Sequence, residues 1–173
     1  MVISAWNFPS GETSVGEHPA HVVATMSRII EHVEEQALDR LPDLDEDRRG
    51  STARAVSHAA VGIGRDVDAR YLIAFTETGL TARLIARWRS ATPPLAFTPN
   101  PRVRSLLSLV WGVETYLVPN VEHTDDMVEQ VDRALLETGR ASAGDRVVIV
   151  AGVPPGMPGT TNGLRVHRMG HAD

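Results

Sequence analysis

Residues 71–81, YLIAFTETGLT, decide the fold of this chain. The run YLIAF is apolar, of strand length and without polar alternation, which predicts a strand buried on both faces. Strands of this kind belong to parallel sheets that helices cover on either side. The polar TETG segment supplies a turn, and a helix is expected to follow it. The sequence that follows, within residues 51–173, repeats this strand–turn–helix unit.

The repeats extend toward the C-terminus as apolar strand runs at 95–98, 115–118 and 147–150. Apolar residues at helical spacing precede and separate these runs, at about 51–67, 81–88, 101–107 and 124–139. Ser51 or Thr52, Asn100 and Thr124 are the expected helix caps. A helix between two strands returns the chain to the same end of the sheet, so the strands should pair in parallel.

The last strand pattern, at 164–169, follows a loop without a helix, and we expect it to be antiparallel to its neighbour. The predicted fold class is therefore α/β, a three-layer α/β/α sandwich of about five strands, mainly parallel with an antiparallel last strand.

The chain divides by pattern into three parts. Residues 1–36 hold a loop-like stretch at 9–16 and then a helix at about 18–36 with one apolar stripe. Residues 37–50 are densely charged and without periodicity, which predicts an exposed linker. Residues 51–173 form the predicted α/β domain.

Composition limits the possible functions. The chain has 42% hydrophobic and 23% charged residues, which is typical of a soluble globular protein. A formal net charge of −5 argues against a nucleic-acid partner, and the absence of cysteine excludes disulfides and thiolate chemistry. No apolar run has the length of a membrane span, and the N-terminus lacks a signal-peptide pattern, so we expect a cytoplasmic protein.

Two loops should meet at one edge of the sheet, because ligands of open α/β folds bind beyond the carboxyl ends of the strands. In the first loop, Thr76, Thr78, Gly79 and Thr81 supply hydroxyls and a flexible backbone that could hold a phosphate group. The same residue types also serve simply as turn and cap residues, and Glu77 would repel an anion. Both interpretations stay open on residue types alone.

The second loop, at 151–163, is rich in glycine and proline and is too long for a simple reversal. Its Gly159, Thr160 and Thr161 should lie beside the first loop, although a rigid turn would have the same composition. His167 and His171 are expected on the surface. No phosphate-binding P-loop and no dinucleotide-binding glycine motif is present.

Several blocks of sequence, taken in order, resemble the pyruvate kinase family. The blocks are SGETSVGEHP at 10–19, FTETGLTAR at 75–83, LAFTPN at 95–100, VWGV at 110–113, GD at 144–145 with VIVAG at 148–152, and PGTTN at 158–162 with VHR at 166–168. These blocks occur in order along almost the whole chain from residue 10 onward. The likeness is to the family's C-terminal, allosteric domain, preceded by the last helix of the catalytic (β/α)8 barrel.

The resemblance implies phosphoryl transfer from phosphoenolpyruvate to ADP in the complete enzyme, with Mg²⁺ and K⁺. The family's catalytic and metal-binding residues lie in earlier barrel strands. We therefore assign no catalytic residue, no metal site and no bound cofactor to this chain, and we expect no kinase activity from it alone.

What the resemblance leaves for this chain is regulation and assembly. The family's effector-phosphate positions match Thr76, Thr78, Gly79, Thr81, Gly159, Thr160 and Thr161. The implied partners are a phosphorylated effector, such as a sugar phosphate or AMP, and either further copies of the chain or a separate barrel chain. The alternative is a stand-alone phosphometabolite-binding or dimerisation module.

Overall fold

The computed structural model describes residues 10–37, 51–157 and 159–171. The chain separates into two compact units, residues 1–43 and 44–173. The linker is expected at 37–50; Ala37 is the last residue of helix α2, and residues 38–50 lie outside the described residues, so the linker stays a prediction.

The N-terminal unit contains two helices, α1 (Ser10–Ser14) and α2 (Pro19–Ala37). The expected helix at 18–36 is confirmed as α2, whereas the expectation of a loop at 9–16 is wrong for α1. Packing of α1 against α2 overrides its weak intrinsic helix propensity. The apolar stripe of α2 stays exposed in this unit, with Ile29 55% and Val33 38% accessible.

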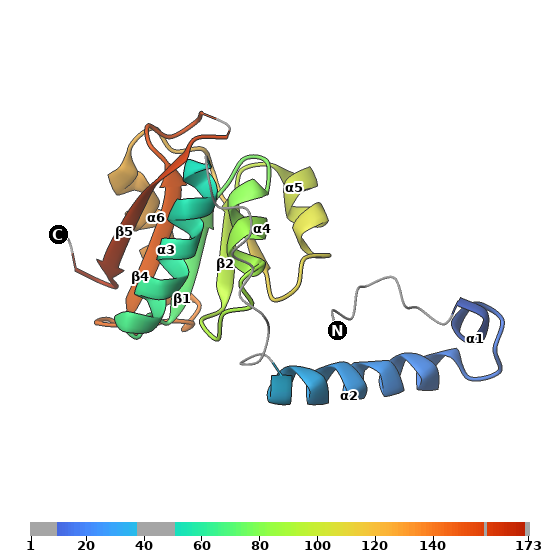
Figure 1. Ribbon diagram of the computed structural model, residues 1–173. Coiled ribbons are helices and arrows are strands. Elements are labelled where there is room, and N and C mark those ends of the chain that lie inside the picture. The colour runs from blue at the N-terminus through green and yellow to red at the C-terminus, as the bar shows by residue number, and fades with distance from the viewer. Residues whose placement is uncertain (1–9, 38–50, 158, 172–173) are drawn as a thin grey trace. The chain divides into compact units, whose positions relative to one another are not determined.

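The second unit alternates helices and strands as predicted (Figure 1). Its elements are α3 (Thr52–Asp66), β1 (Tyr71–Phe75), α4 (Leu80–Ala86), β2 (Pro94–Thr98), α5 (Pro101–Leu107), β3 (Glu114–Leu117), α6 (Thr124–Glu137), β4 (Arg146–Gly152) and β5 (Thr161–Arg168).

The five strands form one sheet in the order β3-β2-β1-β4-β5. The first four are parallel and β5 is antiparallel to β4, as the sequence predicts. Ile73 in the central strand pairs with Leu95 of β2 on one side and with Ile149 of β4 on the other. The loops after β1 and β4 therefore leave the same edge of the sheet from adjacent strands.

Helices cover both faces of the sheet, which confirms the three-layer prediction. One core lies under α3, α4 and α5, and the other lies under α6 around Phe97 and Val131. Helix α3 lies especially close to β1, since a methyl group added at Gly64 would sit 2.6 Å from the Leu72 side chain. Gly62, in the same helix, has open space at that position.

Most expected helix caps are present. The Ser51 hydroxyl accepts a hydrogen bond from the Arg54 amide at 3.4 Å, and Asn100 Oδ1 accepts one from the Arg102 amide at 2.9 Å. The expected cap at Thr124 is wrong, because Thr124 is already the first helical residue. The cap is the preceding residue, His123, whose amide donates to the carboxylate three residues later at 3.1 Å.

One histidine differs from the expectation. His171 is exposed, but His167 is completely buried, with Nε2 2.8 Å from Asp132 Oδ1 of α6. The second carboxylate oxygen of Asp132 accepts a hydrogen bond from the Gly170 amide at 3.2 Å. His167 Nδ1 has no partner among the described residues. This pair joins β5 to α6 across 35 residues of sequence.

A second polar cluster lies at the amino ends of the strands. Arg140 binds both carboxylate oxygens of Glu114, and its Nε donates to the Tyr71 hydroxyl at 3.4 Å. That hydrogen bond lowers the pKa of Tyr71 below its ordinary value. Burial, followed by the charge of Glu114, raises the pKa of Tyr116. The two tyrosines of the chain therefore have opposite shifts.

Candidate functional site

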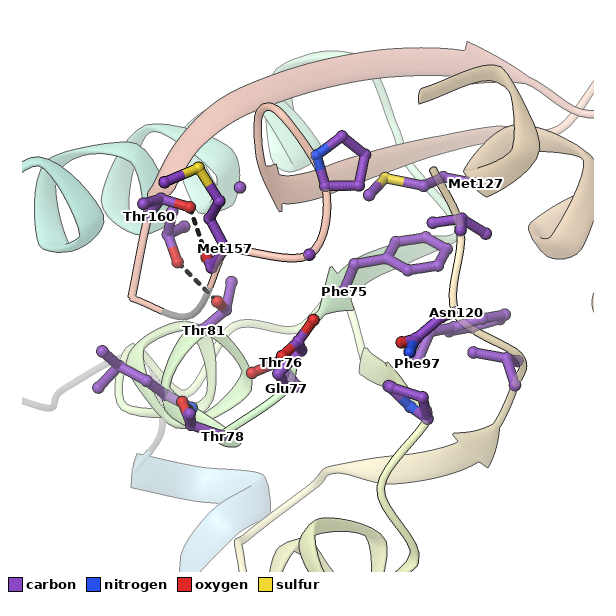
Figure 2. A pocket seen from close by; sticks show the side chains of 18 of the residues that line it. Phe75, Thr76, Glu77, Thr78, Thr81, Phe97, Asn120, Met127, Met157 and Thr160 are labelled. Atoms are coloured by element: carbon purple, nitrogen blue, oxygen red, sulfur yellow. Dashed lines mark hydrogen bonds between the residues drawn. The ribbon is translucent and has the colours of Figure 1, made fainter. Parts of the chain in front are cut away.

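A pocket that is partly open to solvent lies at the carboxyl edge of the sheet (Figure 2). This is the edge at which open α/β folds bind ligands. Five segments form its walls: the end of β1 with residues 76–81, the end of β2, residues 118–121 after β3, Met127 of α6, and the loop from Gly152 to Thr161.

The structure brings together six of the seven predicted site residues. Thr76, Thr78 and Thr81 line the pocket from one side, and Gly159, Thr160 and Thr161 line it from the loop after β4. Gly79 is adjacent but does not line the wall. It precedes α4 with φ +82°, and a side chain there would crowd α5, where Val103 lies 3.3 Å away.

The hydroxyls of the first loop already bind their own backbone. Thr76 Oγ1 accepts from the Gly79 amide at 2.9 Å, and Thr78 Oγ1 accepts from the Leu80 amide at 3.4 Å. A hydroxyl that accepts one hydrogen bond still carries a proton that it can donate. Both side chains can therefore hold the turn and also donate a hydrogen bond to a ligand.

A buried hydroxyl pair joins the two loops. Thr81 Oγ1 and Thr161 Oγ1 lie 2.7 Å apart, and these residues are only 4% and 5% exposed. Thr160 Oγ1 donates to the Met157 carbonyl at 2.6 Å within the second loop. Gly152 makes the close approach of this loop possible, since a side chain there would lie 2.5 Å from Thr160 Oγ1.

The far side of the pocket is mainly apolar, with Asn120 as its polar residue among those described, and the sequence analysis did not include this side in the site. Figure 2 shows Thr78, Thr81 and Thr160 on one side of the pocket and Phe97, Asn120 and Met127 on the other. Part of this wall could have been predicted from the sequence, because residues 118–121 follow a third parallel strand and must therefore lie at the same edge of the sheet. The ring centroids of Phe75 and Phe97 are 5.3 Å apart, which makes this wall a packed surface.

The pocket carries one charged side chain, the partly buried Glu77, among the described residues that line it. None of the described residues that line the pocket is a lysine or an arginine. Hydrogen bonding to an anion would therefore come from hydroxyls and backbone amides.

Within the ranges 10–37, 51–157 and 159–171, no group of three or more histidine, aspartate or glutamate side chains is placed to hold a metal ion. These residues do not fit Mg²⁺, and no chemical step is assigned to a metal in this chain. None of the described helices is both long and apolar enough to cross a membrane.

The fold and the pocket define the class: an open, mainly parallel α/β domain with a pocket at the carboxyl edge of its sheet. Residues 54–167 match the family model described as "Pyruvate kinase, alpha/beta domain". The chain belongs to the pyruvate kinase family, and this segment is the family's C-terminal α/β domain.

Known relatives agree. The chain is 50% identical to the pyruvate kinase of Mycobacterium tuberculosis over 166 residues, covering 95% of this chain and 34% of that protein. It is 50% identical to the Corynebacterium glutamicum pyruvate kinase over 162 residues, covering 93% of this chain and 33% of that protein. A crystal structure of a pyruvate kinase from Cryptosporidium parvum superimposes with a TM-score of 0.72 at 28% identity, covering 92% of this chain and 32% of that one.

The chain thus spans about a third of the length of the curated relatives it matches.

Proposed function

We propose that this domain regulates a pyruvate kinase by binding a phosphorylated small-molecule effector, a sugar phosphate or AMP, in the pocket at the carboxyl edge of the sheet. The observation that supports the proposal is that two loops distant in sequence, 76–81 and 152–161, wall one pocket and are joined by the Thr81–Thr161 hydroxyl pair. Thr76 and Thr78 add two hydroxyls that can donate to a phosphate group.

We assign the remaining segments of the chain, and the activity of the complete enzyme, by analogy with the pyruvate kinase family. Segment 1–36 corresponds to the end of the catalytic barrel, 37–50 is a linker, and the complete cytoplasmic enzyme transfers the phosphoryl group of phosphoenolpyruvate to ADP with Mg²⁺ and K⁺. The exposed apolar residues of α2, such as Ile29, support an origin in a larger assembly, either a homo-oligomer or a complex with a separate barrel chain. A coupled assay of pyruvate formation should find no turnover by this chain alone.

Isothermal titration calorimetry of the chain with glucose 6-phosphate and AMP tests effector binding. At least one of these compounds should bind, and Thr78→Ala should weaken that binding about tenfold, the value of one hydrogen bond to a charged group. Thr78 is exposed, so its loss should leave the fold intact. Thr138→Ala removes a hydroxyl outside the pocket wall and is the matched control.

Absence of heat and of any thermal shift with both compounds would eliminate the effector proposal. A dimer measured by sedimentation in that case would favour the alternative of a dimerisation module.

A further inference from the structure

The sequence analysis gave no role to Asn162. It lies next to Thr161, and its side-chain amide binds the backbone of Val153 at two points. The Val153 amide donates to Asn162 Oδ1 at 2.7 Å, and Asn162 Nδ2 donates to the Val153 carbonyl at 2.8 Å. This pair of hydrogen bonds, here called the clamp, joins the first residue after β4 to the start of β5. It lies at the base of the loop 152–161, here called the neck, where the two ends of the loop meet.

The clamp sits where the regular strand pairing breaks. Ala151 pairs with Gly163 and Gly152 pairs with Thr161, so Asn162 is an extra residue in β5, a β-bulge. The extra residue of a bulge is itself unpaired, and it disrupts the ladder locally. Here the side chain of that residue, Asn162, binds both backbone polar groups of Val153, the residue that follows β4.

The bulge decides which way Thr161 points. In a regular strand Thr161 would share a face with Arg165 and His167, because alternate residues lie on the same face. Arg165 and His167 both contact side chains of α6. Thr161 instead contacts Thr81 of α4, which covers the opposite face. One extra residue reverses the side on which a strand residue lies.

The neck has little room for any other arrangement. A side chain at Gly163 would lie 2.7 Å from Val153 Cγ2, and one at Gly152 would lie 2.5 Å from Thr160 Oγ1. Because neither residue has a side chain, Val153 and Thr160 can pack directly against the backbone of these two glycines, which the clamp and the bulge require.

We infer that Asn162 is a positioning residue of the pocket: its clamp on Val153 holds the β5 bulge that directs the Thr161 hydroxyl to Thr81 and the loop 152–161 to the pocket wall. The inference rests on the proposed effector site and adds the element that pre-forms it. Asn162 does not line the pocket, so its effect on a ligand acts through Thr161 and the loop.

The test compares the affinity of the whole chain for glucose 6-phosphate and AMP in wild type, Asn162→Ala and Asn162→Asp. If the clamp is lost and the loop is competent for only about a tenth of the time, affinity falls about tenfold. Asn162 is exposed, so the fold should survive, which thermal unfolding checks. Asn100→Ala is the matched control, since it also loses a side-chain bond to a backbone amide, but outside the pocket.

Asn162→Asp gives a readout that a general loss of stability would not move. At neutral pH its carboxylate would face the Val153 carbonyl without a proton to donate, so binding should be weakened at least as much as in Asn162→Ala. As the pH falls toward about 4, the acid gains a proton and can again donate. The affinity of Asn162→Asp relative to wild type at the same pH should then recover, while that of Asn162→Ala should not.

The outcomes separate the two proposals. If wild type binds and Asn162→Ala binds equally well, the positioning role is overturned and the effector site stands. If Asn162→Ala and Asn100→Ala weaken binding equally, the effect is general destabilisation and the inference is also overturned. If wild type binds neither compound, the effector proposal fails and the inference fails with it.

Discussion

The hydroxyl pair between Thr81 and Thr161 should be energetically coupled, and a double-mutant cycle measures this. Replacing either threonine by valine keeps the side-chain shape and leaves the other hydroxyl buried without its 2.7 Å partner. A buried unpaired polar group costs about 1–3 kcal/mol, whereas removing both partners can be nearly neutral. We expect each single variant to lose about 1–2 kcal/mol and the double variant to lose little more than one of them.

Urea denaturation of the four proteins gives the free energies of unfolding, and the expected coupling is about 1–2 kcal/mol. Thermal midpoints should fall by roughly 2–4 °C for each kcal/mol. Thr52→Val, at the exposed first residue of α3, is the control and should change stability by less than about 0.5 kcal/mol. Additive losses in the double variant would refute the coupling and with it the direct link between the two loops.

Because α3 lies close to the sheet, Gly64→Ala should lower the free energy of unfolding by about 1–3 kcal/mol through overpacking. Gly62→Ala in the same helix should raise it by up to about 1 kcal/mol. Equal effects of the two variants in urea denaturation would contradict this packing. Asp132→Ala should cost about 1–3 kcal/mol, because it leaves the buried His167 ring without its partner. Unchanged stability would show that the ring reaches solvent. In an alkaline titration followed by tyrosinate absorbance, one phenol should ionise below the ordinary tyrosine pKa and the other above it. Tyr71→Phe should remove the lower step; a single step in wild type would rule out the arginine contact.

The three-layer arrangement of the fold could be predicted from the sequence. Apolar runs such as 71–75 mark strands buried on both faces, and the helices between them require parallel pairing. The antiparallel last strand also followed from local pattern, since the loop at 151–163 contains no crossover helix. These features depend on residues close together in the chain, where composition is informative.

Features that depend on distant partners could not be predicted. His167 looks like any polar residue of an edge strand, and its burial is set by Asp132, which lies on a helix 35 residues earlier. The bulge at Asn162 is likewise visible only when the register with β4 is known. The apolar wall of the pocket was missed because Phe75 and Phe97 belong to strands and were interpreted as core alone.

The parts of the pocket leave the ribosome in the order in which their residues follow one another in the chain. The first loop belongs to β1, near the middle of the chain, while Thr161 begins β5, the last strand before the C-terminus. Contacts between segments this far apart in sequence form late, because the intervening chain must be ordered first. Binding competence should therefore be the last property the nascent domain acquires, and a polypeptide that ends before residue 161 would lack one wall of its ligand site.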